Sequence, residues 1–274
     1  MNSQSEDHEP METVQLSISE NVLESAQAHF ERGVIYTKQG RPEEAVREFE
    51  AVLRIKPDFA KAHHNLGAVY SEQDRLEDAI GAYQAAFRIQ PNLAEAHHGL
   101  GLVFGKQGLL DKAISEFQVA LRIEPDYAEA HYNLGVLYVG KGNLEQAIEE
   151  FKDALRVRPN YVEAHINLGA AYSAQGRSDE AIHEYQAVLE IKPDSAEAHY
   201  NLGTNYGSRG LHDQALHEFQ AAVRIKPDYV EALENMAVAY WQVGYHEDAI
   251  EQLKIAARLG SAKSRLMLTQ LGQV

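Results

Sequence analysis

Amide and imidazole side chains recur at a fixed spacing along this sequence of 274 residues. Asparagine returns at multiples of 34 residues, and histidine stands two residues before most of these asparagines. An amide offers two donors and an acceptor, which suits the alternating N–H and C=O groups of an extended peptide. Imidazole can bind a metal or transfer a proton. The asparagines are Asn65, Asn133, Asn167, Asn201 and Asn235.

The histidines do not form a recognisable catalytic or metal-binding set. His63–His64 and His97–His98 look like ligand pairs, but adjacent helical residues point about 100° apart and no carboxylate or cysteine completes either set. The glycines of Gly99–Gly105 have the wrong spacing for a phosphate loop. The sequence contains no HExxH, GxSxG or P-loop motif. We therefore predict no enzymatic activity, no cofactor and no metal.

The composition narrows the classes of partner. The formal net charge is −16, so the chain repels phosphate backbones and anionic lipid surfaces and attracts basic partners. No apolar run is long enough to cross a bilayer, the first ten residues do not resemble a secretory signal, and cysteine is absent. We predict a cytoplasmic protein that binds neither nucleic acid nor membrane.

The spacing that places the amides belongs to seven consecutive repeats of 34 residues, with positions counted from 1 in each. Position 8 is Gly or Ala, positions 11 and 24 are mostly aromatic, position 20 is Ala and position 32 is mostly Pro. The repeats cover 26–59, 60–93, 94–127, 128–161, 162–195, 196–229 and 230–263.

Each repeat is predicted to form two helices joined by a turn. Positions 3, 4, 7, 8 and 11 share one face of the first helix. Gly at position 15 ends that helix in the left-handed conformation, where the second repeat has Asp74, and Pro at position 32 ends the second helix. Acidic residues after the proline predict a capping box for the next helix. The predicted pairs are Asp126 with Glu129, Asp194 with Glu197 and Asp228 with Glu231.

The ends of the chain differ from the repeats. Residues 1–14 are polar and charged and are expected to be a disordered tail. Residues 15–25 are expected to extend the first helix toward the N-terminus. After the seventh repeat, Ser261 can begin a last helix, and 264–274 are expected to cap the array by covering its final apolar face.

The repeat resembles the tetratricopeptide repeat (TPR), whose W-x₂-L-G-x₂-Y…A-x₃-F…P pattern matches positions 4, 7, 8, 11, 20, 24 and 32. The main departure is histidine at position 4, where the family often has tryptophan. The resemblance implies an all-α, right-handed TPR solenoid of seven helix-turn-helix repeats plus a C-terminal capping helix. It also implies that the first helices line a concave groove. The asparagines at position 6 resemble the series in the TPR region of O-GlcNAc transferases, which holds peptide backbone.

Further candidate groove residues lie beside the asparagines. Position 5 supplies His64, His98, Tyr132 and Tyr200, and Trp241 stands at position 12 of the last repeat. Trp241 either anchors a partner or packs against the terminal helix. The asparagines themselves have two alternative explanations: they bond between neighbouring first helices, or they were inherited when the repeats were duplicated.

We therefore predict a non-catalytic scaffold whose groove binds an extended or basic segment of another protein. One alternative is a substrate-recruiting or regulatory subunit of a separate enzyme, such as a glycosyltransferase. Another is a scaffold that assembles with copies of itself, so a homo-oligomer is also expected under that hypothesis. Fold alone does not choose between these functions.

Overall fold

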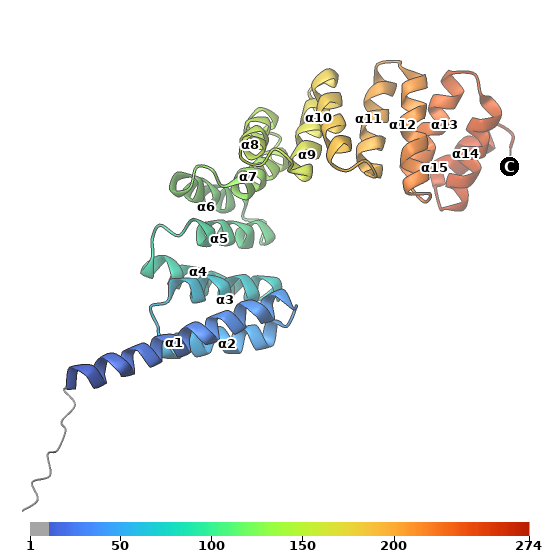
Figure 1. Ribbon diagram of the computed structural model, residues 1–274. Coiled ribbons are helices and arrows are strands. Elements are labelled where there is room, and N and C mark those ends of the chain that lie inside the picture. Colours follow the sequence, from blue (N-terminus) through green and yellow to red (C-terminus); the bar gives the residue numbers. More distant parts are fainter. Residues whose placement is uncertain (1–10, 274) are drawn as a thin grey trace, which may run out of the picture. The chain divides into compact units, whose positions relative to one another are not determined.

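The structure is a computed structural model. It describes residues 11–273, with side chains from residue 25 onward. Within these residues the chain forms fifteen α-helices and no strand (Figure 1). The helices are α1 (Met11–Lys38), α2 (Pro42–Ile55), α3 (Ala60–Glu72), α4 (Leu76–Ile89), α5 (Ala94–Lys106), α6 (Leu110–Ile123), α7 (Ala128–Gly140), α8 (Leu144–Val157), α9 (Val162–Ala174), α10 (Ser178–Ile191), α11 (Ala196–Ser208), α12 (His212–Ile225), α13 (Val230–Gln242), α14 (His246–Arg258) and α15 (Ala262–Gln270).

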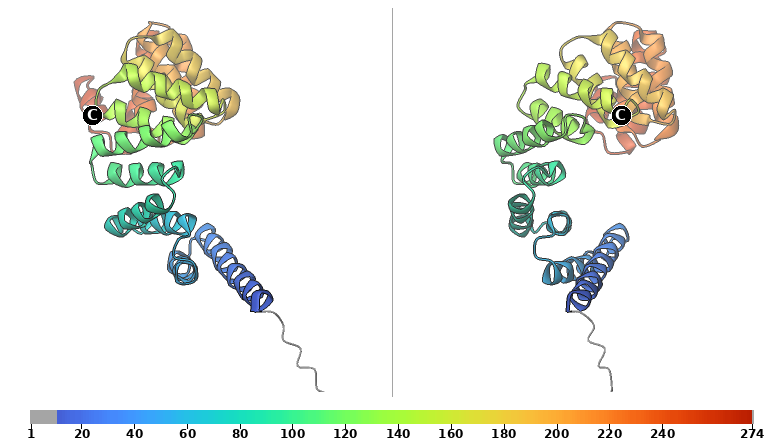
Figure 2. Two further views of the ribbon diagram at one scale, coloured as in Figure 1. Left: turned by 90° about the vertical axis from the view of Figure 1, so that its left-hand side faces the viewer. Right: turned by 60° about the vertical axis from the view of Figure 1, so that its left-hand side comes forward.

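These helices belong to two compact units, Met1–Ala130 and His131–Val274. In the first unit α1 packs on α2, α3 on α4 and α5 on α6, and in the second α9 packs on α10, α11 on α12 and α13 on α14 (Figure 2). Successive pairs within a unit meet through the second helix of one repeat and the first helix of the next, as α2 meets α3 and α12 meets α13. Each unit is therefore a stack of helix pairs.

The predicted division of each repeat into two helices is confirmed. From the second repeat onward, first helices occupy positions 1–13, and second helices begin at position 17. The turn between them contains a residue with positive φ, which is glycine in six repeats and Asp74, at φ 59°, in the second. The second helices of repeats one to six end at position 30, two residues before the proline. The all-α fold of repeated helix pairs follows directly from the repeat pattern.

The predicted capping boxes are wrong for two of the three pairs. The residue that caps α11 is Ser195 rather than Asp194, and its side chain accepts a hydrogen bond from the Ala198 N–H at 3.3 Å. Tyr229 precedes α13 and makes no capping bond through its side chain. The turn after the proline is one residue longer than a capping box requires, so Glu197 lies too close to the helix start. Such a glutamate still faces the positive end of the helix dipole.

The two ends differ in how much the structure describes. Of the tail expected over 1–14, residues 1–10 lie outside the described residues, and α1 begins at Met11. At the other end, α15 begins after Ser261, whose hydroxyl accepts a hydrogen bond from the Ser264 N–H at 2.9 Å. No helix in residues 11–273 combines the length and apolar character that crossing a membrane requires.

The two helices of a repeat approach each other most closely where glycine at position 8 meets the aromatic ring at position 24. A Cβ atom added at Gly135 would lie 2.6 Å from the Phe151 ring, which is closer than van der Waals contact allows. The same contact recurs in the other five repeats that have glycine there, at 2.6–3.0 Å. In the last repeat Ala237 faces the smaller Leu253. Any side chain at position 8 therefore requires a smaller partner at position 24.

This contact predicts that Gly135→Ala destabilises the protein, because the new methyl group overpacks against Phe151 at a cost of about 1–3 kcal/mol. Urea unfolding followed by circular dichroism measures the change. Gly140→Ala is the matched control in α7, because a Cβ there meets no atom within 4 Å and alanine favours helix by up to about 1 kcal/mol. Equal stability of the two variants would contradict the proposed packing.

Candidate functional site

The five asparagines at position 6 lie on first helices and are all half-buried. Two of them bond to the repeat before their own. The Asn167 side-chain N–H donates to the Tyr132 hydroxyl at 3.1 Å and to the Glu163 carbonyl at 3.0 Å. Asn235 donates to the Tyr200 hydroxyl at 3.3 Å. Bonding between neighbouring first helices is therefore present at Asn167 and at Asn235, and sequence reasoning had left it open.

The aromatic rings at position 5 pack against other aromatic rings. Tyr132 lies 6.0 Å from Phe151 and 5.0 Å from Tyr161, measured between ring centroids. His98 and Tyr200 make the equivalent contacts in their repeats, and His64 contacts Tyr83 at 5.7 Å. Each of these contacts lies within one repeat, so the ring at position 5 joins the first helix of a repeat to later parts of the same repeat.

Burial also fixes the charge of the two histidines at position 5. It lowers the pKa of His98 to about 4 and lowers the pKa of His64 in the same direction. Both rings are therefore neutral at pH 7, and neither supplies a positive charge for an acidic ligand.

The break in the asparagine series at Gly99 has a steric cause. A Cβ at residue 99 would lie 2.5 Å from the hydroxyl oxygen of Tyr83. Tyr83 therefore fills the space that the amide occupies in other repeats. Burial raises the pKa of the Tyr83 hydroxyl, so it remains protonated. Tyr185 is the other tyrosine at position 24, and the repeat after it keeps its asparagine, Asn201. A tyrosine at position 24 therefore does not always exclude asparagine from the next repeat.

Sequence reasoning selected Trp241 but missed the other members of a set of exposed apolar side chains at positions 9 and 12 of the first helices. An aliphatic or aromatic residue at either position indicates an exposed apolar surface, because both positions lie outside the packing face. Val238 is 42% exposed and Trp241 is 40% exposed. The set comprises Leu102, Val136, Val139, Val238 and Trp241.

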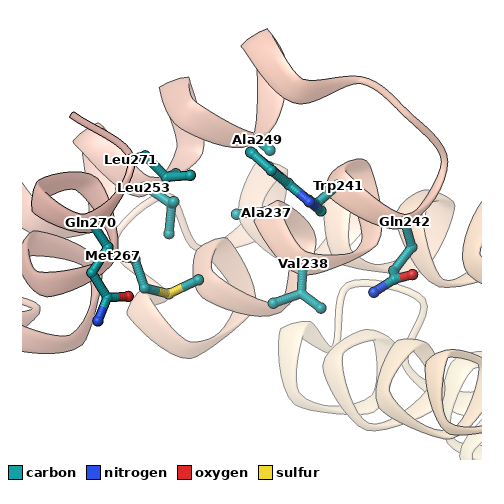
Figure 3. Close-up of a pocket in the computed structure, with 9 residues that line it drawn as sticks. All are labelled: Ala237, Val238, Trp241, Gln242, Ala249, Leu253, Met267, Gln270 and Leu271. Atoms are coloured by element: carbon teal, nitrogen blue, oxygen red, sulfur yellow. The ribbon is translucent and has the colours of Figure 1, made fainter. Parts of the chain in front are cut away.

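Trp241 lines a cavity of about 270 Å³ between α13, α14 and α15 (Figure 3). Leu253, Met267 and Leu271 form the other walls, and the Trp241 ring also lies 4.4 Å from the His246 ring. Trp241 thus lies beside the terminal helix, and a substantial part of its surface stays accessible. A second cavity, of about 280 Å³, lies between α11, α12 and α13 and shares Val238 with the first.

The histidines at position 4 join the two helices of their own repeat. In each of five repeats Nδ1 of this histidine lies 2.6–2.7 Å from Oε2 of a glutamate at position 23. Ala82 replaces the glutamate in the second repeat, and the last repeat has Leu233 and Gln252 instead of the pair. The five His–Glu links are His29–Glu48, His97–Glu116, His131–Glu150, His165–Glu184 and His199–Glu218.

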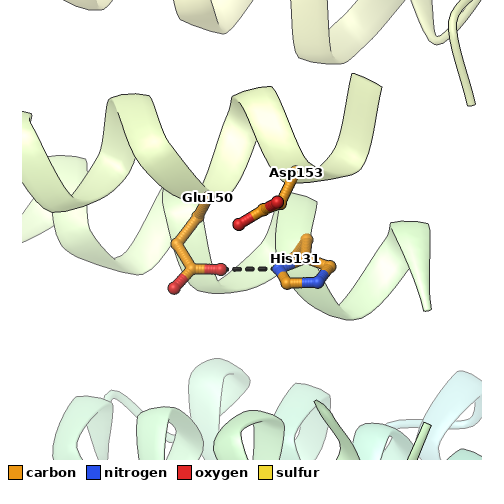
Figure 4. Close-up of side chains that lie close together, drawn as sticks. All are labelled: His131, Glu150 and Asp153. Atoms are coloured by element: carbon orange, nitrogen blue, oxygen red, sulfur yellow. Dashed lines mark hydrogen bonds and ion pairs between the residues drawn. The ribbon is translucent and has the colours of Figure 1, made fainter. Parts of the chain in front are cut away.

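One of these links has a third ligand-type group beside it. His131, Glu150 and Asp153 bring one possible ligand atom each within 4.8 Å of one another (Figure 4). The His131–Glu150 bond is the link found in four other repeats, and Asp153 also pairs with Arg156 at 3.2 Å. The cluster is accounted for by helix pairing and an exposed ion pair, so we assign it a structural role.

Two of the linked histidines use both ring nitrogens. His165 Nε2 lies 2.9 Å from the Pro159 carbonyl, and His199 Nε2 lies 3.2 Å from the Pro193 carbonyl. With an acceptor at each nitrogen, the ring bonds to both only when both nitrogens carry hydrogen. Burial lowers the pKa of His165, but the bonds to Glu184 and to the Pro159 carbonyl outweigh burial and raise the pKa above its usual value.

The fold and these links define a helical repeat protein in which each repeat carries its own internal connections. A family model described as "Tetratricopeptide repeat" matches residues 132–196. Another, described as "TPR repeat", matches 33–74, 70–108, 106–142 and 204–244. The chain belongs to the tetratricopeptide repeat family, and its fold is a helical TPR solenoid.

Several solved structures are similar to this chain, whereas no curated protein sequence matches it. YrrB, titled a TPR protein with an unusual peptide-binding site, is 28% identical over 68% of this chain and 95% of its own, with a TM-score of 0.60. MamA is 28% identical over 61% of this chain and 97% of its own, with a TM-score of 0.57. PilF of Pseudomonas aeruginosa shares the fold, at 20% identity, 80% and 99% coverage and a TM-score of 0.71.

The pKa of His165 predicts a pH-dependent contribution to stability. Because the pKa is raised in the folded protein, the contribution is complete below the unfolded value of about 6.5 and is lost as pH rises through the folded value. His165→Leu with Glu184→Gln reproduces the residue pair of the last repeat. Thermal unfolding should show the wild type about 1–3 kcal/mol more stable than this variant at pH 6, with a smaller difference at pH 8.

The exposed His183 on α10 provides the control. His183→Gln should show the same difference in stability between pH 6 and pH 8 as the wild type. A difference between wild type and the double variant that is constant with pH, or that grows toward pH 8, would show that the link does not depend on a protonated ring.

Proposed function

We propose that the protein is a non-catalytic scaffold whose first helices bind an extended segment of another protein. TPR proteins mediate protein–protein interactions, and the proteins of this family are typically not enzymes. The observation that carries the proposal is the combination on first helices of half-buried amides at position 6 with exposed apolar side chains at positions 9 and 12. Together they suit a ligand with a regular backbone and apolar side chains.

The Asn235 amide keeps hydrogen-bonding capacity beyond its bond within the protein. Asn235 uses one N–H for the Tyr200 hydroxyl, and among the described residues nothing bonds its carbonyl oxygen. An extended backbone offers N–H donors at the spacing of its residues, and such a donor can use that oxygen. The resemblance of the asparagines to those of O-GlcNAc transferases supports the same role.

The asparagines persist where the tyrosine hydroxyl is missing. Asn65 follows a repeat with Phe30 at position 5, and Asn201 follows a repeat with Ile166 there. Neither side chain can accept a hydrogen bond. A bond between first helices therefore does not account for every asparagine, which favours a ligand as the shared reason.

Acidic residues support a partner segment that contains basic residues. Position 2 carries exposed glutamates at Glu95, Glu163, Glu197 and Glu231, and the chain as a whole has a net charge of −16. A basic side chain next to the bound segment gains from this field, most strongly at low ionic strength. YrrB, which is described as having a peptide-binding site, supports peptide recognition on this type of scaffold.

The proposal predicts that Asn133→Ala with Asn201→Ala releases a partner captured by the wild type from a lysate of the native cell. A segment of the captured protein should then bind the variant about tenfold or more weakly in calorimetry, because one net hydrogen bond per site is worth about 0.5–1.5 kcal/mol. Thermal stability should stay within about 1 kcal/mol of the wild type. Capture and affinity equal to those of the wild type would refute the role of the amides.

A pair of single variants separates ligand binding from bonding within the protein. Asn167→Ala and Tyr132→Phe both remove the bond between these residues, but only the first removes the amide. Under the proposal Asn167→Ala weakens binding and Tyr132→Phe does not. If both variants lose the same stability and neither affects binding, Asn167 has a structural role only.

A further inference from the structure

We infer that the C-terminal end of the groove recognises two bulky apolar side chains of one extended, locally uncharged partner segment, one in each of two cavities that meet at Val238. This inference rests on the proposed function and specifies the class of ligand. Both cavities lie within the second unit, between α11 and α15.

The first cavity exists because the last repeat departs from the packing of the others. Ala237 and Leu253 replace the glycine and the aromatic ring that fill this space in earlier repeats, and both residues line the cavity. In addition, α15 has 9 residues where α13, the first helix of the repeat before it, has 13. It therefore covers only part of the face that α13 and α14 present (Figure 3).

The second cavity has a different origin in the sequence. Gly207 occupies position 12 of the sixth repeat, where the seventh has Trp241, and the missing side chain leaves space at a cavity whose wall includes the buried Phe219 ring. Thr204 and Val238 form opposite walls, on α11 and α13. Asn235 lies at this cavity, so an amide from the position-6 series stands next to an apolar hollow.

Size and charge indicate the kind of side chain that fits. The volumes of about 270 and 280 Å³ exceed the roughly 150 Å³ in which an apolar cavity binds benzene, so each can take a side chain the size of phenylalanine or leucine. Among the described residues that line the two cavities there is no Asp, Glu, Lys or Arg. A charged side chain would lose its hydration there without gaining a partner.

The shared wall sets the spacing of the two side chains. The cavities lie on either side of α13, so their separation is about one helix-to-helix distance, roughly 8–10 Å. An extended chain advances about 3.3 Å per residue. The two apolar residues are therefore expected about two to four positions apart, with the backbone between them passing Asn235.

Trp241 is the only tryptophan in the chain and lines the first cavity, so its fluorescence reports occupancy directly. The probes are acetylated and amidated peptides of serine and threonine with two phenylalanines placed two, three or four positions apart. Peptides with one phenylalanine, or with none, serve as reference ligands. We expect one spacing to give a saturable change in emission at a concentration about tenfold or more below that of the single-phenylalanine peptide.

Two glutamate substitutions of exposed aliphatic residues test where the peptide binds. Val238→Glu places a carboxylate at both cavities and should weaken binding roughly tenfold or more. The control is Leu109→Glu, which changes a side chain in the turn before α6 that is 40% exposed and lies outside both cavities and outside positions 6, 9 and 12. It should leave binding unchanged. Thermal unfolding checks that both variants are folded.

Two further variants test the cavities separately. Leu271→Glu alters the first cavity and Thr204→Glu alters the second. Each variant should lower the affinity for the two-phenylalanine peptide to that for the single-phenylalanine peptide. The inference is overturned if no spacing gives a saturable signal with the wild type, or if Leu109→Glu weakens binding as much as Val238→Glu.

The same variants distinguish failure of this inference from failure of the proposed function. If Asn133→Ala with Asn201→Ala releases the captured partner while Val238→Glu retains it with unchanged affinity, the groove function stands and the paired cavities are overturned. If the two-phenylalanine peptide binds in the predicted pattern while the asparagine substitutions leave capture unaffected, the cavities stand and the role of the amides is refuted.

Discussion

The close approach of glycine at position 8 to the aromatic ring at position 24 is the contact on which the rest of each repeat depends. With no Cβ on one helix, the ring on the other lies directly against its backbone, as Phe151 does against Gly135. This contact sets the separation of the two helices. At that separation the histidine at position 4 reaches the glutamate at position 23, and the ring at position 5 reaches its aromatic neighbours. One constraint therefore places both the polar and the aromatic connections.

The candidate binding surface consists of positions that this packing does not use. Positions 9 and 12 lie beside the packed face, so their side chains can vary without disturbing the contact between helices, whereas position 6 of the third repeat is restricted to Gly99 by Tyr83. The repeats indeed vary more at position 12 than at position 8: Trp241 corresponds to Gly207 one repeat earlier. The apolar cavity beside Trp241 lies where the packing itself is relaxed, because Ala237 and Leu253 replace glycine and a ring. Structure and recognition are thus divided between different positions of the same short helix.

The sequence was sufficient to predict what depends on neighbours along the chain. Repeat length, the limits of most helices and the positive φ of the residue at position 15 follow from local spacing, and all agree with the structure. The capping boxes failed because the exact residue at a helix start depends on how the preceding turn is built. The His–Glu links could have been found, since histidine and glutamate recur 19 residues apart and are lost together in the last repeat.

Contacts between repeats were harder to predict, and they bear most directly on function. The bond from Asn167 to Tyr132 joins residues 35 apart, and its geometry requires the positions of two first helices. Inheritance by duplication explains why an asparagine recurs, but it would preserve neighbouring positions as well. Position 5 has diverged into Phe30, His64, Tyr132, Ile166 and Glu234, while position 6 of the last four repeats remains asparagine. A side chain that stays constant beside one that changes indicates a common requirement at position 6, and a ligand backbone that runs past successive repeats would impose that requirement.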